Sequence, residues 1–169
     1  METKTPRESF TTVTDMVLPS ETNPLNNLFG GELLARMDRA ASIAARRHSR
    51  RIVVTASVNN VSFNRMVPLG SVVTIEAQVT RAFRTSMEVH MDVWVEDRES
   101  GQRTKANEAI YSFVAVDDTG RPVEVPSIVP ESKEEKTRYD AALRRKQLSL
   151  VLAGKMKASE ATELKALFE

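Results

Sequence analysis

The stretch that decides the fold runs from Asn23 to Asp38 and reads Asn-Pro-Leu-Asn-Asn-Leu-Phe-Gly-Gly-Glu-Leu-Leu-Ala-Arg-Met-Asp. It joins a loop rich in side-chain amides to a glycine pair, Gly30 and Gly31, which allows the backbone to approach a ligand closely. The spacing of apolar residues after the pair predicts a helix over Gly31–Arg47. The start of this helix would present unpaired N–H groups and a positive dipole end to developing negative charge.

Asp38 is an acid of this helix without a basic neighbour at helical spacing. At 3.6 residues per turn it lies at the edge of the apolar arc, beside Leu34, Ala41 and Ala45. No Lys or Arg stands three or four residues away, so a helical ion pair does not account for it. A solvated surface aspartate is the commoner role for an isolated acid, and a functional carboxylate is the alternative.

Composition limits the class of protein. A chain of 169 residues is long enough for one core. A net charge of +1 and only 5% aromatic residues give no basis for nucleic-acid binding. The absence of cysteine excludes disulfides, thiolate metal sites and a Cys nucleophile, and it is typical of a reducing compartment.

The N-terminal residues Met1–Ser9 are charged and are followed by no apolar run of signal-peptide length. No stretch approaches the ~18 to 20 apolar residues that span a bilayer. We therefore expect a soluble, cytoplasmic protein without a membrane partner.

Alternating and β-branched residues predict about five strands. Short connections at Ala82–Arg84 and Glu99–Gly101 predict hairpins, because such links join antiparallel neighbours but not parallel ones. The helix must lie across this antiparallel sheet to cover its apolar stripe, so the fold class is α+β. The last strand is apolar enough to be covered on both faces. The expected strands are Phe10–Leu18, Ile52–Val58 with a continuation past Asn60 to Phe63, Val73–Thr80, Met87–Glu96 and Thr104–Val116.

The residues beyond Pro130 differ in composition, which predicts a domain over 1–130 and a helical C-terminal extension over 131–169. Within the extension we expect an amphipathic helix over Tyr139–Leu152 and a weaker one over Ser159–Phe168. A basic cluster on the first helix is interpreted as a solvated face, with a phosphate contact or a subunit contact as the alternatives. It comprises Arg144, Arg145 and Lys146.

From about Val17 to Glu135 the chain resembles the acyl-CoA thioesterases of the hot-dog fold, in particular the cytosolic acyl-CoA hydrolase group. The order and spacing of many short matches carry this resemblance. They are Asn23-Pro24 through Phe29-Gly30-Gly31, Met37-Asp38, Val54–Val58, Phe63, Gly70, Arg84–Val89, Phe113–Asp117, Gly120-Arg121-Pro122 and Val125-Pro126.

The resemblance implies a long helix wrapped by a curved antiparallel sheet. It also implies dimers that extend the sheet edge to edge, assembled as a trimer of dimers. Each active site would then combine the glycine-pair loop of one subunit with the helix acid of the other, and acyl-CoA would be the substrate.

The resemblance also assigns roles to residues. Asp38 would act as general base or nucleophile, Asn27 would assist, and the N–H groups of Gly30 and Gly31 would stabilise the oxyanion. Arg84, Thr85 and Ser86 resemble the segment that lines the CoA channel. Three positions depart from the family pattern: Asn26 and Phe83 stand where relatives have Gly, and Met66 replaces a Pro.

Thioester hydrolysis suits a chain of this composition. A thiolate leaves readily, so a carboxylate, an ordered water and two oxyanion donors suffice without a catalytic triad. His48 and His90 are interpreted as structural or exposed, and no metal site or cofactor is expected, since coenzyme A belongs to the substrate.

Two other functions are weighed beside hydrolysis. One is a sensor or assembly module that binds acyl-CoA without turnover. The other, a dehydratase acting on enoyl thioesters, is disfavoured because His48 lies well past the Asp38 position. The preferred acyl length and the role of the tail stay open.

Overall fold

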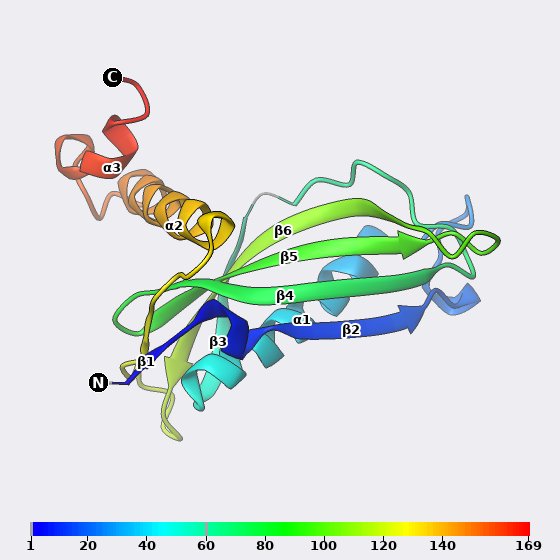
Figure 1. Ribbon diagram of the computed structural model, residues 1–169, viewed down its shortest axis with the longest axis horizontal. Helices are drawn as coiled ribbons and strands as arrows, with labels where there is room; N and C mark the ends of the chain where they lie inside the picture. Colours follow the sequence, from blue (N-terminus) through cyan, green and yellow to red (C-terminus); the bar gives the residue numbers. More distant parts are fainter. Residues whose placement is uncertain (1, 60) are drawn as a thin grey trace.

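The structure is a computed structural model that describes residues 2–59 and 61–169 (Figure 1). Its main sheet is antiparallel throughout, with the strand order β2-β4-β5-β6-β3. The helix α1, over Gly30–Ser49, lies across one face of this sheet. The strands are β2 (Thr11–Met16), β3 (Ile52–Asn59), β4 (Val72–Ala82), β5 (Ser86–Glu96) and β6 (Arg103–Val116). The predicted α+β fold, a long helix wrapped by a five-stranded antiparallel sheet, is confirmed.

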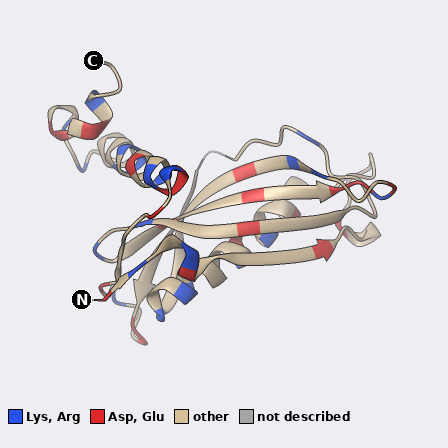
Figure 2. Cartoon of the chain, in the orientation of Figure 1, with Lys and Arg blue, Asp and Glu red and all other residues tan. Residues whose placement is uncertain are grey.

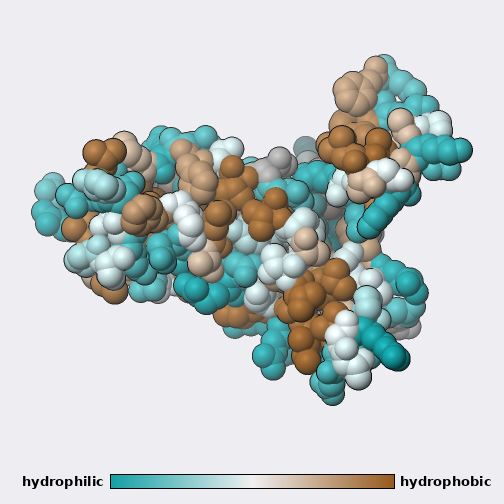
Figure 3. Space-filling model, turned by 180° about the vertical axis from the view of Figure 1, so that it is seen from behind, coloured by the Kyte–Doolittle hydropathy of each residue, from teal (hydrophilic) through white to brown (hydrophobic). Residues whose placement is uncertain are grey.

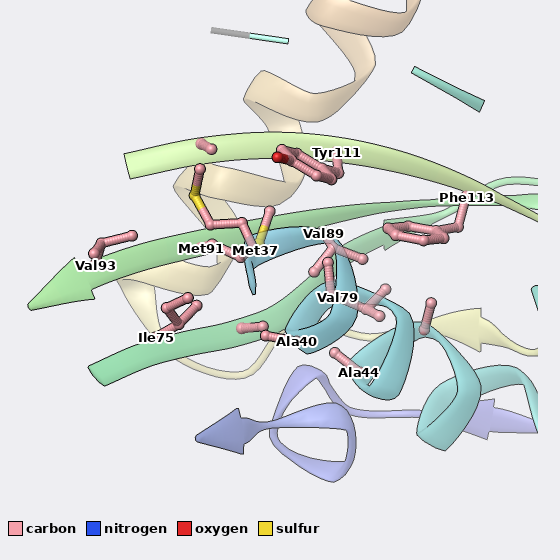
Figure 4. Close-up of a cluster of buried hydrophobic side chains, with 14 of the residues drawn as sticks. Met37, Ala40, Ala44, Ile75, Val79, Val89, Met91, Val93, Tyr111 and Phe113 are labelled. Atoms are coloured by element: carbon pink, nitrogen blue, oxygen red, sulfur yellow. The ribbon is translucent and has the colours of Figure 1, made fainter. Parts of the chain in front are cut away.

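The core lies between α1 and the sheet. Met37, Ala40 and Ala44 are fully buried on the helix, and alternate residues of β4 and β5, among them Val79 and Met91, meet them from the sheet (Figure 4). Alanines on the buried helix face let the backbone approach the strands closely, which leaves room for the larger side chains of the sheet. Truncating Met37 to Ala would cost about 2–5 kcal/mol of stability.

Both predicted hairpins are present. β4 pairs with β5 across the turn at Phe83–Thr85, and β5 pairs with β6 across the turn at Asp97–Gln102. β6 lies between β5 and β3, and most of its C-terminal half is buried, as its apolar sequence predicts. β3 is therefore an edge strand, and its outer edge has no partner among the described residues.

The expected continuation of β3 to Phe63 is wrong. The strand ends at Asn59, and Val61–Phe63 are not in a strand, while Asn60 lies outside the described residues. Beyond this segment the backbone N–H of Asn64 donates to the side chain of Asn107, at 3.1 Å from Oδ1. The chain thus leaves the sheet earlier than its apolar residues predict.

A second, two-stranded sheet was not predicted. β1 (Thr3–Lys4) and β7 (Ser127–Ile128) pair in parallel, and each is too short to leave a periodic signal. Short 3-10 turns at Pro6–Ser9 and Pro19–Glu21 begin with prolines, whose fixed φ suits the first position of a helical turn.

The C-terminal extension holds α2 (Lys133–Leu152), a 3-10 turn at Ala158–Glu160 and α3 (Thr162–Lys165). α2 begins six residues before the expected Tyr139, because Ser132 and Glu135 form a reciprocal capping box at its start. The weak helix expected over Ser159–Phe168 is correspondingly shorter and broken. Whether residues 1–130 and 131–169 are separate domains stays a prediction.

In the part of the chain that the structure describes, no helix combines the length and apolar character that a membrane span requires.

Candidate active site

Asp38 lies in the third turn of α1, where the helix passes under β3. It is half-buried, and Thr55 Oγ1 on β3 donates a hydrogen bond of 2.7 Å to Asp38 Oδ1. Among the described residues Asp38 forms no ion pair, as its helical neighbours predict. Thr55 therefore orients the carboxylate without neutralising it.

Tyr111 on β6 anchors the same turn of the helix. Its hydroxyl donates to the backbone carbonyl of Leu34 at 3.0 Å, the carbonyl one helical turn before Asp38. Burial and, secondly, the negative charge of Asp38 raise the pKa of Tyr111 to about 12. The phenol is thus neutral at any physiological pH, and it acts as a fixed dipole beside the acid.

The glycine pair begins α1, as the sequence predicts. Phe29 is the N-cap and supplies no side-chain cap, so the helix start has no internal acceptor for its first N–H groups. No acceptor for the N–H of Gly30 or Gly31 is found within the described residues. The pair can therefore donate to an oxygen that arrives from outside the protomer.

The two glycines are not equivalent. A Cβ on Gly30 would lie 3.2 Å from Cζ of Phe63, a tight contact that requires a small shift of the Phe63 ring. A Cβ on Gly31 would meet nothing within 4 Å, because the space in front of it is open. Gly31 thus faces the space that a substrate or a neighbouring subunit would enter.

The loop before the pair is organised by Asn23. Its Oδ1 accepts hydrogen bonds from the backbone N–H groups of Leu25, at 3.0 Å, and Asn27, at 3.1 Å. Asn26 adopts a left-handed backbone with φ of 56°, a conformation that Asn tolerates better than most residues and that glycine adopts freely. Asn26 therefore supplies the left-handed turn conformation that the loop requires at this position.

Asn27, predicted to assist catalysis, lies in this loop with its amide nitrogen near two groups of its own chain. They are the carbonyl of Leu25, at 3.3 Å, and Sδ of Met66, at 3.2 Å. Both contacts are long or weak, so they fix the side chain loosely.

A buried ion pair ties the loop to α1. Arg36 Nη2 donates to Glu21 Oε2 at 2.7 Å and to the carbonyl of Met16 at 3.1 Å. Glu21 in turn accepts the N–H of Leu18 through its side chain and that of Phe29 through its carbonyl. The orientation of the loop therefore depends on this pair.

One protomer does not bring these groups together. Asp38 and Gly30 are eight residues apart on one helix, a separation of about 12 Å along its axis. A cavity of about 670 Å³ lies beyond the loop, lined by Met66, Leu69 and residues of the β5–β6 turn, and Asp38 does not line it. A site that needs both the acid and the glycine N–H groups is incomplete within one chain.

Arg84, Thr85 and Ser86 lie at the β4–β5 turn, away from the loop. The carbonyls of Arg84 and Thr85 accept hydrogen bonds from the backbone N–H groups of Val125 and Ala115, which fixes the turn. The side chain of Arg84 is exposed and forms no ion pair within the described residues. The turn thus presents a free cation on a rigid support.

Both histidines have structural surroundings. His48 is fully buried and its Nε2 lies 2.7 Å from the carbonyl of Pro126, while His90 is 8% exposed on the outer face of β5. Burial lowers the pKa of each below its ordinary value of 6.5. Potential ligand atoms of His90, Asp92 and Glu108 lie within 4.8 Å of one another, but the ammonium of Lys105 contacts both carboxylates. We assign no metal to this cluster.

Sequence reasoning did not single out Thr55 or Asn23 as functional residues. In the sequence Thr55 is one residue of a β-branched strand and of the Val54–Val58 match. The one sequence feature that could have indicated a role for Thr55 is its hydroxyl on the strand that directly follows the helix of Asp38. In the sequence Asn23 is one of three loop amides, and only its hydrogen bonds distinguish it from the others.

Residues 25–102 match the model of the thioesterase superfamily. The chain is 41% identical over 144 residues to the uncharacterized acyl-CoA thioester hydrolase YkhA of Bacillus subtilis, covering 85% of this chain and 84% of that protein. It is similar to a solved apo-hexameric acyl-CoA thioesterase, with 37% identity, a TM-score of 0.86 and coverage of 90% and 98% of the two chains.

The fold is also similar to that of an acyl-CoA hydrolase of Staphylococcus aureus solved with butyryl coenzyme A and coenzyme A. The identity is 33%, the TM-score 0.82, and the match covers 97% of this chain and 99% of the other. Structures of that hydrolase also exist with an aspartate, an asparagine or a threonine replaced by alanine. Along that protein the asparagine precedes the aspartate by fifteen residues and the threonine follows it by seventeen.

Proposed function

Because this chain belongs to the thioesterase superfamily, as a hot-dog relative of the acyl-CoA thioester hydrolases, we propose that it hydrolyses acyl-CoA thioesters to a free fatty acid and CoA. The observation that carries this proposal is the half-buried carboxylate of Asp38, held by Thr55 and free of any cation within the described residues. In this proposal the hydrolysis needs no cofactor, because coenzyme A is part of the substrate.

In the proposed reaction Asp38 accepts a proton from water, whose oxygen attacks the thioester carbonyl. The carbonyl oxygen gains negative charge, which the N–H groups of Gly30 and Gly31 stabilise together with the helix dipole. The carbon–sulfur bond then breaks, and the thiolate of CoA leaves with a proton returned by Asp38. Direct attack by the carboxylate, through an anhydride that water later opens, remains the other role of Asp38.

The acid and the oxyanion donors of one site come from different subunits in this proposal. The axial separation of about 12 Å between Asp38 and Gly30 supports a shared site, because one thioester carbon must be within reach of both groups. Gly31 faces open space in its own chain, which leaves room for that neighbour.

The edge strand β3 supports the dimer. Three apolar side chains on it, Ile52, Val54 and Val58, are each about half exposed, and Figure 3 shows apolar surface gathered over this region. An exposed apolar edge strand with unpaired N–H and C=O groups is a template for pairing with another copy. We propose that two copies pair through β3 and that three such dimers form a hexamer, the state of the similar solved thioesterase.

The intervals in the Staphylococcus aureus protein support two additions to the site. In this chain the same intervals separate Asn23 from Asp38 and Asp38 from Thr55. We propose that Asn23 orients the loop and the substrate carbonyl and that Thr55 orients the acid. The assisting role of Asn27 and the CoA contacts of Arg84, Thr85 and Ser86 stay predictions.

We also propose a cytoplasmic location, which suits a chain without cysteine.

The experiment is thiol release from a panel of acyl-CoAs by the wild type and by Asp38→Asn. We expect the variant to lose about 100-fold or more in turnover while it keeps the wild-type circular dichroism and oligomeric state. Asp118→Asn, an exposed turn acid, is the matched control and keeps full activity. Binding of acyl-CoA by the wild type without any thiol release would favour the alternative, a non-catalytic sensor.

A further inference from the structure

The basic cluster of α2 divides into two parts with different surroundings. Arg145 points to the sheet, where Nε and Nη2 bind the two carboxylate oxygens of the buried Glu88 at 2.9 and 2.7 Å. Thr80 Oγ1 also donates to Glu88 at 2.8 Å. The charge of Arg145 is therefore neutralised inside the protein, and the interpretation of the cluster as a solvated face is wrong for this residue.

Lys146, one residue further, lies over the β4–β5 turn. Its Nζ is 5.2 Å from the ring centroid of Phe83, and the guanidinium of Arg81 is 5.7 Å from the same centroid. Arg81 is itself stacked on Tyr139 of α2 at 3.9 Å and donates to its carbonyl. These contacts hold the helix against the turn, with two cations around one aromatic ring.

The cations at this place have no acidic partners. Arg81, Arg84, Arg144 and Lys146 form no ion pair with any described carboxylate, and the buried acid nearby, Glu88, is already bound by Arg145. Figure 2 shows Lys and Arg both on α2 and near the hairpin below it. A concentration of unpaired positive charge on a rigid support favours a polyanionic ligand.

We propose that Lys146 of α2, together with Arg81 near the end of β4, binds the phosphate groups of the CoA nucleotide beside Arg84, whose contact with CoA the family resemblance already implies. The C-terminal extension is then part of the substrate-binding surface. Phe83 stands where relatives have Gly, and here its ring holds the ammonium of Lys146 beside the turn without neutralising it. This inference rests on the proposed function, because it assigns the nucleotide end of the same substrate.

The experiment compares one acyl group on CoA with the same acyl group on pantetheine, which lacks the nucleotide and its phosphates. Lys146→Gln is expected to raise KM for the acyl-CoA roughly fivefold at low salt, the effect of losing one exposed ionic contact. KM for the pantetheine thioester and kcat for both substrates stay at the wild-type values. The rise in KM shrinks as salt is added.

Two further variants separate binding from folding. Lys146→Arg keeps both the cation and its contact with Phe83, and it restores the KM of the wild type. Lys155→Gln removes an exposed lysine just beyond α2 and changes neither KM. An equal change of KM for both substrates, no change for either, or a changed oligomeric state in Lys146→Gln would each overturn the inference. Failure of the proposed function looks different, because the wild type itself would then release no thiol.

Discussion

At the scale of single residues, the hydrogen bond from Thr55 to Asp38 is the contact on which the proposed chemistry depends most. Thr55→Val keeps the β-branched shape and the strand but removes the donor, so the carboxylate is no longer oriented. We expect kcat to fall about 10- to 100-fold with little change in KM, measured by thiol release. Thr55→Ser, which keeps the hydroxyl, is the matched control and retains most of the activity. Equal activity of the Val and Ser variants would remove Thr55 from the site.

His48 makes a residue-scale prediction about pH. Burial lowers its pKa in the folded state, and Lys4 lowers it further, while the Pro126 carbonyl and then Glu8 and Glu2 act in the opposite direction. In the unfolded chain the imidazole of His48 binds a proton near its ordinary pKa of 6.5, whereas in the folded chain it does so only at lower pH. The free energy of unfolding therefore falls as the pH drops below about 6.5. The free energy of unfolding should fall by about 1 kcal/mol more in wild type than in His48→Gln between pH 7.5 and 5.5. Parallel urea-unfolding curves for the two proteins across this range would show that another group is responsible.

At the scale of elements, the loop from Asn23 to Gly30 is oriented by the ion pair between Glu21 and Arg36. Arg36 is only 6% exposed, so Glu21→Gln leaves a buried cation without its anion. We expect a loss of about 2–3 kcal/mol in the free energy of unfolding, together with a lower kcat. Glu21→Gln combined with Arg36→Met removes both charges and recovers most of the stability but not the activity. Stability measured by denaturant titration and thiol release together distinguish these outcomes.

The elements that sequence predicts well are those with a strong period. The alternation of Val73, Ile75, Ala77 and Val79 determines the inward face of β4, and the short turns fix its pairing with β5. The end of β3 could not be predicted from local pattern, because the chain beyond it is held by a distant contact: the backbone N–H of Asn64 donates to the side chain of Asn107, 43 residues away. The start of α2 at Lys133 could not be predicted from periodicity, because the charged residues of its first turns contain no apolar repeat. The capping box of Ser132 and Glu135 is the feature that determines this start.

Some residues of the candidate site could likewise be predicted from the sequence and others could not. Asp38, Gly30 and Gly31 could be found from local pattern and family resemblance, because each is defined by its place in one helix. Thr55 could not, since its role arises only when β3 lies beside α1. The contact of Arg145 with Glu88 likewise joins residues 57 positions apart, which no local pattern reveals.

At the scale of the whole molecule, the edge strand β3 and the open space at Gly31 both favour an oligomer as the functional unit. The protomer carries an acid at one place and N–H donors about 12 Å away along the same helix. In the proposed mechanism the two halves of each site therefore come from different subunits. In a two-fold dimer such an arrangement gives two equivalent sites, each with one acid and one glycine pair.

The measurement that tests this claim most directly mixes two inactive variants. Asp38→Asn lacks the acid, and Gly31→Pro lacks one N–H donor in the first helical turn, where proline is tolerated. Random pairing of equal amounts makes half of the dimers mixed, and each mixed dimer holds one site with both native groups. We predict that co-expressed or co-refolded variants recover roughly one quarter of the wild-type rate of thiol release. A mixture that forms mixed oligomers yet is no more active than the two variants alone would contradict the shared site.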